Sequence, residues 1–457
     1  MVWVIRRFQP DVIINRFAHE GYGGHGHHTA SAILSVEAFD LAADPDAFPH
    51  QLEYVDTWQA GQLWHNVSTW WDKELPERAK TDTSIISFEV SDYEPLLGRS
   101  IGEIASISRS QHRSQGFGTT LQRGSNIEYL QWIKGADFDT TLFSDADTKW
   151  SSLEGGSELE ELIAGAQEKF NPKDPAASVP ELVKVARAIE ELPPSRFKES
   201  KLKLSRELIS QCAGLWFEAN TGYYEVQPGS SVKLDVSFLN RSDVPVEIEG
   251  FSVNDFDTTF TQELKYNRTH LVPVQMSVDE DHPYTEQYWL RKPPLRGRFV
   301  VKDQELRGLP ESDAPFTVAV DVMVAGYNFE KTIPVIHKWA DRAEGEQIRY
   351  LTVVPGVSVN PTEQVVMALN RESTAVDIQV KSHAPMQAGV LRLKMPSGWL
   401  SQPELVRFEL ENRHEEEVFS FQLTPGKGAV NGPVTAVAET PDKNYDQSLK
   451  TIDYDHI

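Results

Sequence analysis

The pattern of apolar and polar positions changes character twice along the chain. In residues 1–135, apolar positions at helical spacing alternate with short continuous apolar runs, which predicts helices alternating with strands. Residues 136–222 show the mixed apolar and charged faces that are typical of surface helices. From residue 223 the period becomes two, and turns rich in Gly, Pro, Asn and Asp separate the apolar runs. We therefore expect a multidomain chain with an α/β part, a helical part and an all-β part.

The α/β part begins with apolar residues at helical spacing, which Pro10 ends. The apolar run Val12-Ile13-Ile14 follows and favours a strand covered on both faces. Ser100 and Glu103 have the spacing of a capping box at the start of a later helix. Strands are predicted over residues 11–17, 63–67 and 83–90, and helices over 1–9, 29–43 and 95–112. The alternation predicts a partial Rossmann-like α/β domain over residues 1–135.

The helical part, residues 136–222, carries no residue pattern that suggests chemistry. Helices are predicted over residues 157–170, 180–192 and 196–218, with prolines between them. We expect these helices to form a bundle that packs on the first domain.

The all-β part predicts two antiparallel β-sandwiches in tandem, over residues 223–348 and 349–457. The chain stops in strand-like alternation over 449–457, so the second sandwich is expected to be incomplete. At the other end, the first helical pattern has no N-cap residue before it. The patterns at the two ends together predict that the sequence is a fragment of a longer protein.

Composition narrows the classes of function. The chain has 457 residues, which suggests about three domains, and a formal net charge of −24. This charge argues against a nucleic-acid binder, because such proteins need a basic face. Cys212 is the single cysteine, so an internal disulfide or a cysteine zinc cage cannot form. No run of about 20 apolar residues predicts a membrane span, and no signal peptide is recognised.

The candidate chemistry lies in the loop Gly21-Tyr22-Gly23-Gly24-His25-Gly26-His27-His28, between the first predicted strand and the next helix. Imidazoles are common ligands of borderline-soft metal ions. His25 and His28 are three apart and could face one pocket, whereas His27 would point elsewhere. A catalytic zinc site needs about three protein ligands, so this loop supplies at most part of one. The alternative is a flexible polar loop whose histidines bind nothing.

Three segments of the first domain resemble one family. They are Pro10-Asp-Val-Ile-Ile, Gly23-Gly-His-Gly-His-His-Thr-Ala-Ser and His112-Arg-Ser-Gln-Gly. They resemble the PIG-L/LmbE-like de-N-acetylases of the large bacterial multidomain type. The resemblance implies a Rossmann-like fold and a divalent metal, usually zinc. It also implies hydrolysis of an N-acetyl group on an N-acetylglucosamine-type sugar or glycoconjugate.

The resemblance also assigns roles to residues. His28 would be the metal ligand, and His25 would hydrogen-bond the tetrahedral intermediate or the leaving amine. Gly26 and His27 replace the usual Pro and Asp of the family motif His-Pro-Asp-His. Four residues are assigned to the substrate pocket: Arg16, His112, Ser114 and Gln115.

The family's first motif, Ala-His-Pro-Asp-Asp-Glu, does not occur in the 457 residues. In the family it supplies two metal ligands and the general base, and loss of a general base costs about 10²–10⁴-fold in rate. The resemblance therefore implies that this chain is not an active enzyme by itself. Its compartment stays open, although the family's multidomain members are often exported.

A second hypothesis belongs to a different class of function. The tandem sandwiches could act as a glycan- or partner-binding module, with the α/β part vestigial. Exposed aromatic rings can bind sugars, because they combine an apolar face with polar edges. Separately from the sandwiches, four tryptophans of the α/β part are candidates for such a face, although core packing is the favoured role for most of them: Trp58, Trp64, Trp70 and Trp71.

Overall fold

The computed structural model describes residues 1–20, 24–138, 142–143, 146, 149–368 and 372–452. The chain divides into two compact units. The first comprises residues 1–148, 301–310 and 452–457, and the second comprises residues 149–300 and 311–451. The expected combination of mixed α/β structure with all-β structure is confirmed at this coarse level.

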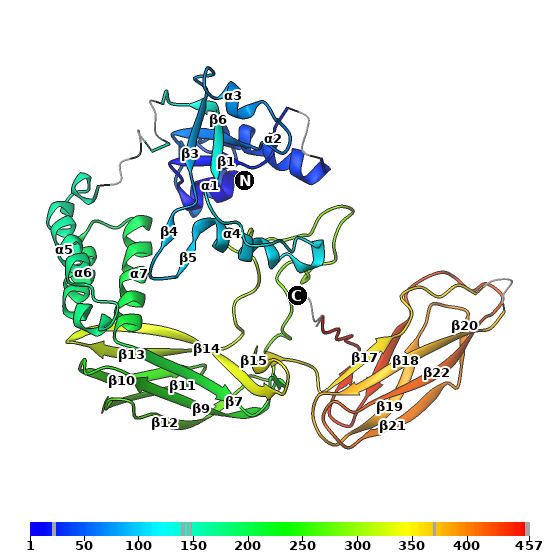
Figure 1. Cartoon of the computed structure of the whole chain (residues 1–457). Coiled ribbons are helices and arrows are strands. Elements are labelled where there is room, and N and C mark those ends of the chain that lie inside the picture. The colour runs from blue at the N-terminus through cyan, green and yellow to red at the C-terminus, as the bar shows by residue number, and fades with distance from the viewer. Residues whose placement is uncertain (21–23, 139–141, 144–145, 147–148, 369–371, 453–457) are drawn as a thin grey trace. The chain divides into compact units, whose positions relative to one another are not determined.

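The first unit contains a small mixed sheet with helices (Figure 1). The sheet has the order β1-β2-β6-β3, in which only β1 and β2 run parallel. Its strands are β1 (Val12–Asn15), β2 (Gln62–Val67), β3 (Ile85–Glu89) and β6 (Ile127–Gly135). A separate hairpin pairs β4 (Tyr93–Glu94) with β5 (Arg99–Ser100). The helices are α1 (Val2–Phe8), α2 (Gly26–Leu41), α3 (Leu75–Arg78) and α4 (Ile101–Ser110), with short 3-10 turns η1 (Pro49–Glu53) and η2 (Arg113–Gln115).

The core of the first unit is built where α2 packs between α1 and the sheet. Ala38 and Ala42 of α2 pack against Val2 and Ile5 of α1, and a second group joins Phe39, Ala60 and Leu63. This burial holds the strand–helix–strand segment β1–α2–β2 in place, because apolar burial contributes about 25 cal/mol per Å².

A buried arginine ties α1 to the end of α2. The guanidinium of Arg6 is fully buried and donates to five backbone carbonyls and to the side chain of Gln51. The shortest of these bonds, 2.7 Å, goes to the carbonyl of Asp44. Because a buried charge is costly unless its donors are satisfied, this network explains how an arginine is accommodated in this small core.

Two details of the first unit differ from expectation. Ile14 in β1 is 48% exposed, so this strand is not covered on both faces; β1 lies at the edge of the sheet, where it has one neighbouring strand. Strand β6 was not predicted, and it pairs antiparallel with both β2 and β3. The capping box is confirmed: Ser100 Oγ accepts from the Glu103 N–H, and the Glu103 carboxylate accepts from the Ser100 N–H.

The second unit begins with helices that belong to it and not to the first unit. They are α5 (Gly156–Lys169), α6 (Val179–Glu191) and α7 (Arg196–Cys212), with 3-10 turns η3 (Trp150–Ser152) and η4 (Pro175–Ser178). Val179 and Val183 of α6 and Ile209 of α7 lie in the same apolar core as the first set of strands. The helices therefore share a core with the strands of their own unit, and the expected packing of this bundle on the first domain stays a prediction.

Helix α7 also ends earlier than predicted. Residues 215–218, predicted as helix, belong to strand β7 (Leu215–Thr221). Gly214 has a left-handed φ of 66° and follows the C-cap Ala213. Glycine adopts this conformation without steric cost, so it is a common helix stop.

The first set of strands forms an eight-stranded sheet with the order β11-β10-β13-β14-β7-β9-β12, in which β15 also pairs with β14. Its long strand β14 pairs with β13 in its first half and with β7 and β15 in its second half. Buried residues from β9, β10 and β13 share one core, which gives a sandwich-like arrangement. The strands are β9 (Ser231–Asn240), β10 (Val246–Val253), β11 (Phe256–Glu263), β12 (His270–Ser277), β13 (Thr317–Val324), β14 (Tyr327–Asp341) and β15 (Gly345–Tyr350). A short parallel pair, β8 (Glu225–Val226) with β16 (Thr352–Val353), follows at the edge of this core.

The second set of strands forms two four-stranded sheets, ordered β17-β18-β22-β20 and β21-β19-β23-β24. Valines and Ile378 from the first sheet and Leu391 and Phe408 from the second meet in one buried core, as in a β-sandwich. The strands are β17 (Val357–Pro361), β18 (Thr374–Ser382), β19 (Gln387–Lys394), β20 (Trp399–Gln402), β21 (Leu405–Leu410), β22 (Glu416–Pro425), β23 (Thr435–Glu439) and β24 (Asn444–Tyr445). Of the strand-like alternation predicted over 449–457, residues 449–452 have no regular structure, and 453–457 lie outside the described residues.

Candidate functional site

The predicted histidine loop lies at the carboxyl end of β1, between β1 and α2. Strand β1 pairs in parallel with β2, so the segment β1–α2–β2 is a strand–helix–strand unit. Ligand sites of open α/β sheets lie at this edge. Residues 21–23 of the loop lie outside the described residues, and His25 is the N-cap of α2.

His25 and His28 approach each other on the first turn of α2. Their ring centroids are 5.1 Å apart at an interplanar angle of 68°. Phe17, two residues beyond the end of β1, stacks on His28 with a centroid distance of 3.9 Å and an angle of 8°. Stacking of this kind restricts the rotation of the imidazole. His25 and His27 are exposed, whereas His28 is half-buried.

Arg16 extends the same edge toward β2. Its guanidinium donates to Oδ1 of Asn66 and lies 5.7 Å from the ring centroid of Trp71. Trp71 in turn lies 6.5 Å from Phe17. Trp71 therefore lies between Arg16, which was predicted to line the substrate pocket, and Phe17, which stacks on His28.

Two further polar residues lie at this edge, His65 on β2 and Asn15 on β1. Burial lowers the pKa of His65 on β2 below 6.5, and the charges of His19 and Arg16 act in the same direction. Asn15 pairs with His65 in the sheet register and is 8% exposed. Its Nδ2 has no hydrogen-bond partner among the described residues. We call Arg16, Phe17, His25, His28 and His65 the histidine edge.

The predicted pocket residues His112, Ser114 and Gln115 lie elsewhere in the described contacts. They follow α4, in and beside η2, and all three are exposed. The ring of His112 lies 6.1 Å from that of Phe117. No contact described for these three residues reaches His25 or His28, and their assignment to the pocket stays a prediction.

The histidine edge brings two imidazoles close enough to share a zinc ion, those of His25 and His28. This pair is one ligand short of the three that a catalytic zinc site takes from its protein. Within the described residues, no group of three metal-ligating side chains includes His25 or His28. The described residues of this edge therefore do not complete a zinc site.

A different group in the second unit does have three converging ligand atoms. Glu225, His383 and His414 offer one atom each, within 4.8 Å of one another, and could hold a metal ion. Oε2 of Glu225 is 3.0 Å from Nδ1 of His383 and 2.8 Å from Nε2 of His414. We call these residues the Glu-His-His cluster.

The cluster is largely buried. The side chains of Glu225 and His383 are 8% and 3% exposed, and that of His414 is 35% exposed. Burial by itself raises the pKa of Glu225, but the hydrogen bonds and charges of the two histidines outweigh it, so this pKa lies below its usual value. Glu225 is therefore a carboxylate at neutral pH, in the charge state that a metal ligand requires.

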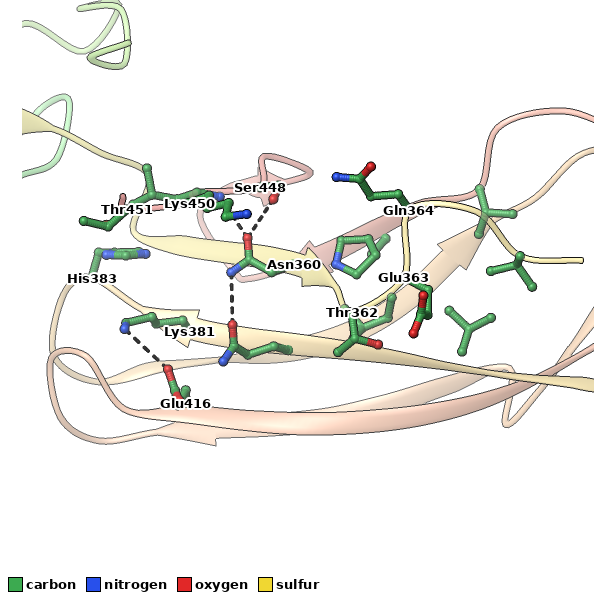
Figure 2. Close-up of a pocket in the computed structure, with 18 of the residues that line it drawn as sticks. Asn360, Thr362, Glu363, Gln364, Lys381, His383, Glu416, Ser448, Lys450 and Thr451 are labelled. Atoms are coloured by element: carbon green, nitrogen blue, oxygen red, sulfur yellow. Dashed lines mark hydrogen bonds and ion pairs between the residues drawn. The ribbon is translucent and has the colours of Figure 1, made fainter. Parts of the chain in front are cut away.

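The cluster lines one end of a cleft of about 990 Å³. Figure 2 shows Asn360 near the middle of this cleft, with His383 at one end and Glu363 and Gln364 at the other. Oδ1 of Asn360 accepts from Ser448 Oγ at 2.7 Å and from the Leu449 N–H at 2.9 Å. Lys381 pairs with Glu416 at 3.4 Å along one wall. The lining is thus mainly polar and anchored by hydrogen bonds.

Sequence reasoning missed this cluster. Glu225 precedes its partners by 158 and 189 positions, so no local spacing links them. One weak signal was present: Arg413-His414 lies in a polar run between two strands, and His383 lies three residues beyond the alternating run Val376-Asp-Ile-Gln-Val380. Turn histidines of this kind are common, and only the tertiary fold shows that two of them face one carboxylate.

Comparisons with known proteins do not identify the chain. No protein-family model and no curated protein sequence matches it. Among solved structures, the chain is similar to red sea bream transglutaminase, at 11% identity and a TM-score of 0.21, over 56% of this chain and 34% of that one. It is also similar to the sporulation control protein Spo0M of Bacillus subtilis, at 11% identity and a TM-score of 0.18, over 46% of this chain and 90% of that one. Similarities this low carry no argument about function.

No helix among the described residues has the length and apolar character needed to cross a membrane.

Proposed function

We propose that the first unit contributes part of the active site of a metal-dependent amide hydrolase of the de-N-acetylase type. In this proposal its substrate is an N-acetylated sugar or glycoconjugate, and zinc is the metal. The chain by itself supplies His28 as one ligand and His25 as a group that contacts the reacting carbonyl. It does not supply the remaining ligands or the general base.

The observation that carries the proposal is the position of His25 and His28 on the first turn of α2, directly after the edge at which β1 and β2 run parallel. An imidazole at a helix N-terminus lies in a positive local potential, which favours developing negative charge nearby. Stacking on Phe17 restricts the His28 ring. The buried and unpartnered Nδ2 of Asn15 is consistent with a further polar group at this edge.

Two exposed tryptophans of the first unit, one of them in contact with the edge, favour a sugar substrate. Trp70 is 79% exposed and Trp71 is 56% exposed, and Arg16 lies against Trp71. By contrast, Trp64 is fully buried, and Trp58 donates its indole N–H to the carbonyl of Pro10 at 2.8 Å. Of the four candidate tryptophans, Trp70 and Trp71 are therefore the two that offer a ring face to a sugar.

The residues of the chain suggest a division of labour on that substrate. Trp70 and Trp71 would bind the sugar ring, and Arg16 would bind an oxygen of the substrate through its guanidinium. His25 would donate a hydrogen bond to the oxygen of the tetrahedral intermediate, where such a bond contributes about 2.7–4 kcal/mol to transition-state stabilisation in hydrolases. In this proposal, proton abstraction from the attacking water would fall to the family's first motif, Ala-His-Pro-Asp-Asp-Glu.

The test extends the chain upstream of Met1 with a strand and loop that carry Ala-His-Pro-Asp-Asp-Glu. Zinc content and acetate release from a panel of N-acetylated aminosugars are then measured. We expect the extended chain to bind zinc and release acetate, and the unextended chain to release none. His28→Ala in the extended chain should lower the zinc content, and His25→Ala should lower the rate with little change in zinc content.

His27→Ala is the matched control, because it is an exposed histidine of the same turn. It should leave both measurements within error of the unsubstituted extended chain. Unchanged zinc content in the extended His28→Ala variant would contradict the ligand assignment.

The polar cleft favours a second candidate function. The 990 Å³ cleft of the second unit has hydrogen-bonding groups from Asn360, Lys381 and Thr451, together with the ring of Tyr224. Such a lining suits a glycan or a polar peptide, so the sandwiches would act as a binding module. Binding of the full chain to an array of glycans and peptides tests this role, with Asn360→Ala as the variant that should lose binding. Ligands that bind Asn360→Ala as tightly as the unsubstituted chain would exclude the cleft.

A further inference from the structure

We propose that the Glu-His-His cluster binds one divalent first-row transition-metal ion, with a fourth coordination position open to the cleft. The ligand atoms would be Oε2 of Glu225, Nδ1 of His383 and Nε2 of His414. This site lies in the second unit and is independent of the function proposed for the histidine edge.

The donor set fits a transition metal. Two imidazoles and one carboxylate are the protein ligands of one kind of catalytic zinc site, and also of non-haem iron(II) sites. Both imidazole nitrogens already face a single carboxylate oxygen, at 3.0 and 2.8 Å. Mg²⁺ and Ca²⁺ prefer oxygen ligands, so the two histidines select against them.

The geometry needs only a small adjustment. Metal–ligand distances of about 2.1 Å at a tetrahedral angle place two ligand atoms about 3.4 Å apart. The two O···N distances are shorter than this by about half an ångström. His414 can supply the shift, because its side chain is 35% exposed and it lies in the turn between β21 and β22.

The more buried histidine is held in orientation by neighbours outside the donor set. Nε2 of His383 lies 2.9 Å from Oγ of Ser358, which is fully buried. The His383 N–H donates to the carbonyl of Gly356 at 2.9 Å, and its carbonyl accepts from Gln227 Nε2 at 2.9 Å. Metal-bound histidines characteristically use their second ring nitrogen in this way, which fixes the face that they present to the ion.

The backbone of His414 supports a function for its position. Its φ is 64°, in the left-handed region that residues other than glycine seldom adopt. Such a conformation is strained and persists where the surroundings hold it. Here the ring of His414 stacks against Tyr224 at 5.6 Å and reaches the carboxylate of Glu225.

The guanidinium of Arg413 lies near the cluster, but its described hydrogen bonds do not go to the carboxylate of Glu225. One guanidinium nitrogen of Arg413 donates to the backbone carbonyls of Glu225 and His383, and the guanidinium lies 4.6 Å from the ring centroid of Tyr223. The described partners of the Glu225 carboxylate are therefore the two histidines. Without a metal the same three residues form a hydrogen-bonded triad, so the experiment has to separate the two states.

The experiment uses the full chain with His25→Ala and His28→Ala, so that the histidine edge contributes no metal binding. After treatment with EDTA and its removal, Zn²⁺, Co²⁺ and Fe²⁺ are titrated in separate calorimetric runs, the last without oxygen. We expect one Zn²⁺ per chain and the absorption bands of four-coordinate Co²⁺. Tighter binding of Fe²⁺ than of Zn²⁺ would also support the proposal and would identify the ion as iron, whereas binding of none of the three ions would overturn it.

Two variants in this background test the ligands. Glu225→Gln keeps the shape of the side chain and removes its charge, and His414→Ala removes a partly exposed ligand. Each should weaken metal binding by at least about tenfold, which is the lower end of the effect of losing a neighbour of a ligand. His270→Ala, in β12 and outside the cluster, is the matched control and should bind as the background does. Unchanged affinity in both ligand variants, with folding verified by circular dichroism, would overturn the proposal.

Discussion

The histidine edge and the Glu-His-His cluster differ in how their histidines are brought together, in sequence separation and in burial. At the edge, His25 and His28 are three residues apart in sequence, and they lie at the first turn of one helix, where His25 is exposed and His28 is half-buried. In the cluster, the three residues come from distant segments and are mostly buried around one carboxylate. A local histidine motif therefore marks a possible site, whereas burial against a carboxylate makes the cluster's geometry specific.

The largest expected difference between the two regions is in stability. Glu225→Ala leaves the buried ring of His383 and the ring of His414 without their shared carboxylate, and a buried group that loses its hydrogen-bond partner costs about 1–3 kcal/mol, more where that partner was charged. His25→Ala removes an exposed side chain and should change stability by no more than about 0.5 kcal/mol. Because a chain of several domains does not unfold in two states, the measurement is amide hydrogen exchange with EDTA present. Peptides covering 357–382 report on the cluster, and peptides covering 26–41 report on the edge.

Similar exchange rates in the two variants would remove the contrast. In that case the cluster would be held by the surrounding strands and not by its own hydrogen bonds.

The second prediction concerns Ser358, whose hydroxyl lies 2.9 Å from Nε2 of His383. Ser358→Ala leaves Nε2 of a buried imidazole without its partner, which costs about 1–3 kcal/mol. If the cluster binds a metal, the same change should lower its affinity by about 10–100-fold. Calorimetric zinc titration and hydrogen exchange measure the two effects. Ser420→Ala, at an exposed position of the same sheet, is the control and should change neither.

These contrasts show which parts of the molecule can be predicted from sequence. The capping box at Ser100 and Glu103 depends on residues three apart, and the structure has both of its hydrogen bonds. The alternating strands of the sandwiches were also predicted, because side chains of a half-buried strand alternate between core and solvent. Strand β7 was missed because only Ala213 and Gly214 separate it from α7, and apolar residues continue across that short link.

The site residues divide in the same way. The pair His25 and His28 could be expected to meet, because residues three apart share one face of a helix. The meeting of Glu225 with His383 and His414 depends on where β8, β18 and the turn before β22 end in space. No period or spacing encodes that position, so the cluster could be found only in the folded chain.

The third prediction sharpens the role of burial at the histidine edge. Phe17→Ala removes the ring that stacks on His28, a contact that contributes about 1 kcal/mol. We expect the His28 imidazole to become mobile, with the change visible in its ¹⁵N relaxation. Phe17→Leu keeps an apolar side chain but not the stacked geometry, and it should give an intermediate result. A His28 ring as rigid in Phe17→Ala as in the unsubstituted chain would show that other contacts hold it.

The smallest expected effect is a pH dependence of stability at the histidine edge, which distinguishes the edge from the cluster. Burial, with the charges of His19 and Arg16, lowers the pKa of His65 in the folded chain, and no carboxylate contributes to this shift. The unfolded chain has the ordinary pKa of about 6.5 at this position, so it binds a proton that the folded chain does not. Stability should therefore fall as the pH drops through 6.5, until the pH reaches the lower pKa of the folded state. Hydrogen exchange of peptides covering 62–67 at pH 7.5 and pH 5.5 should show this loss, and His65→Gln should reduce it. If His65→Gln leaves the pH dependence of this segment unchanged, the loss of stability arises from other groups. In that case the burial of an imidazole without a carboxylate is not what distinguishes the edge from the cluster.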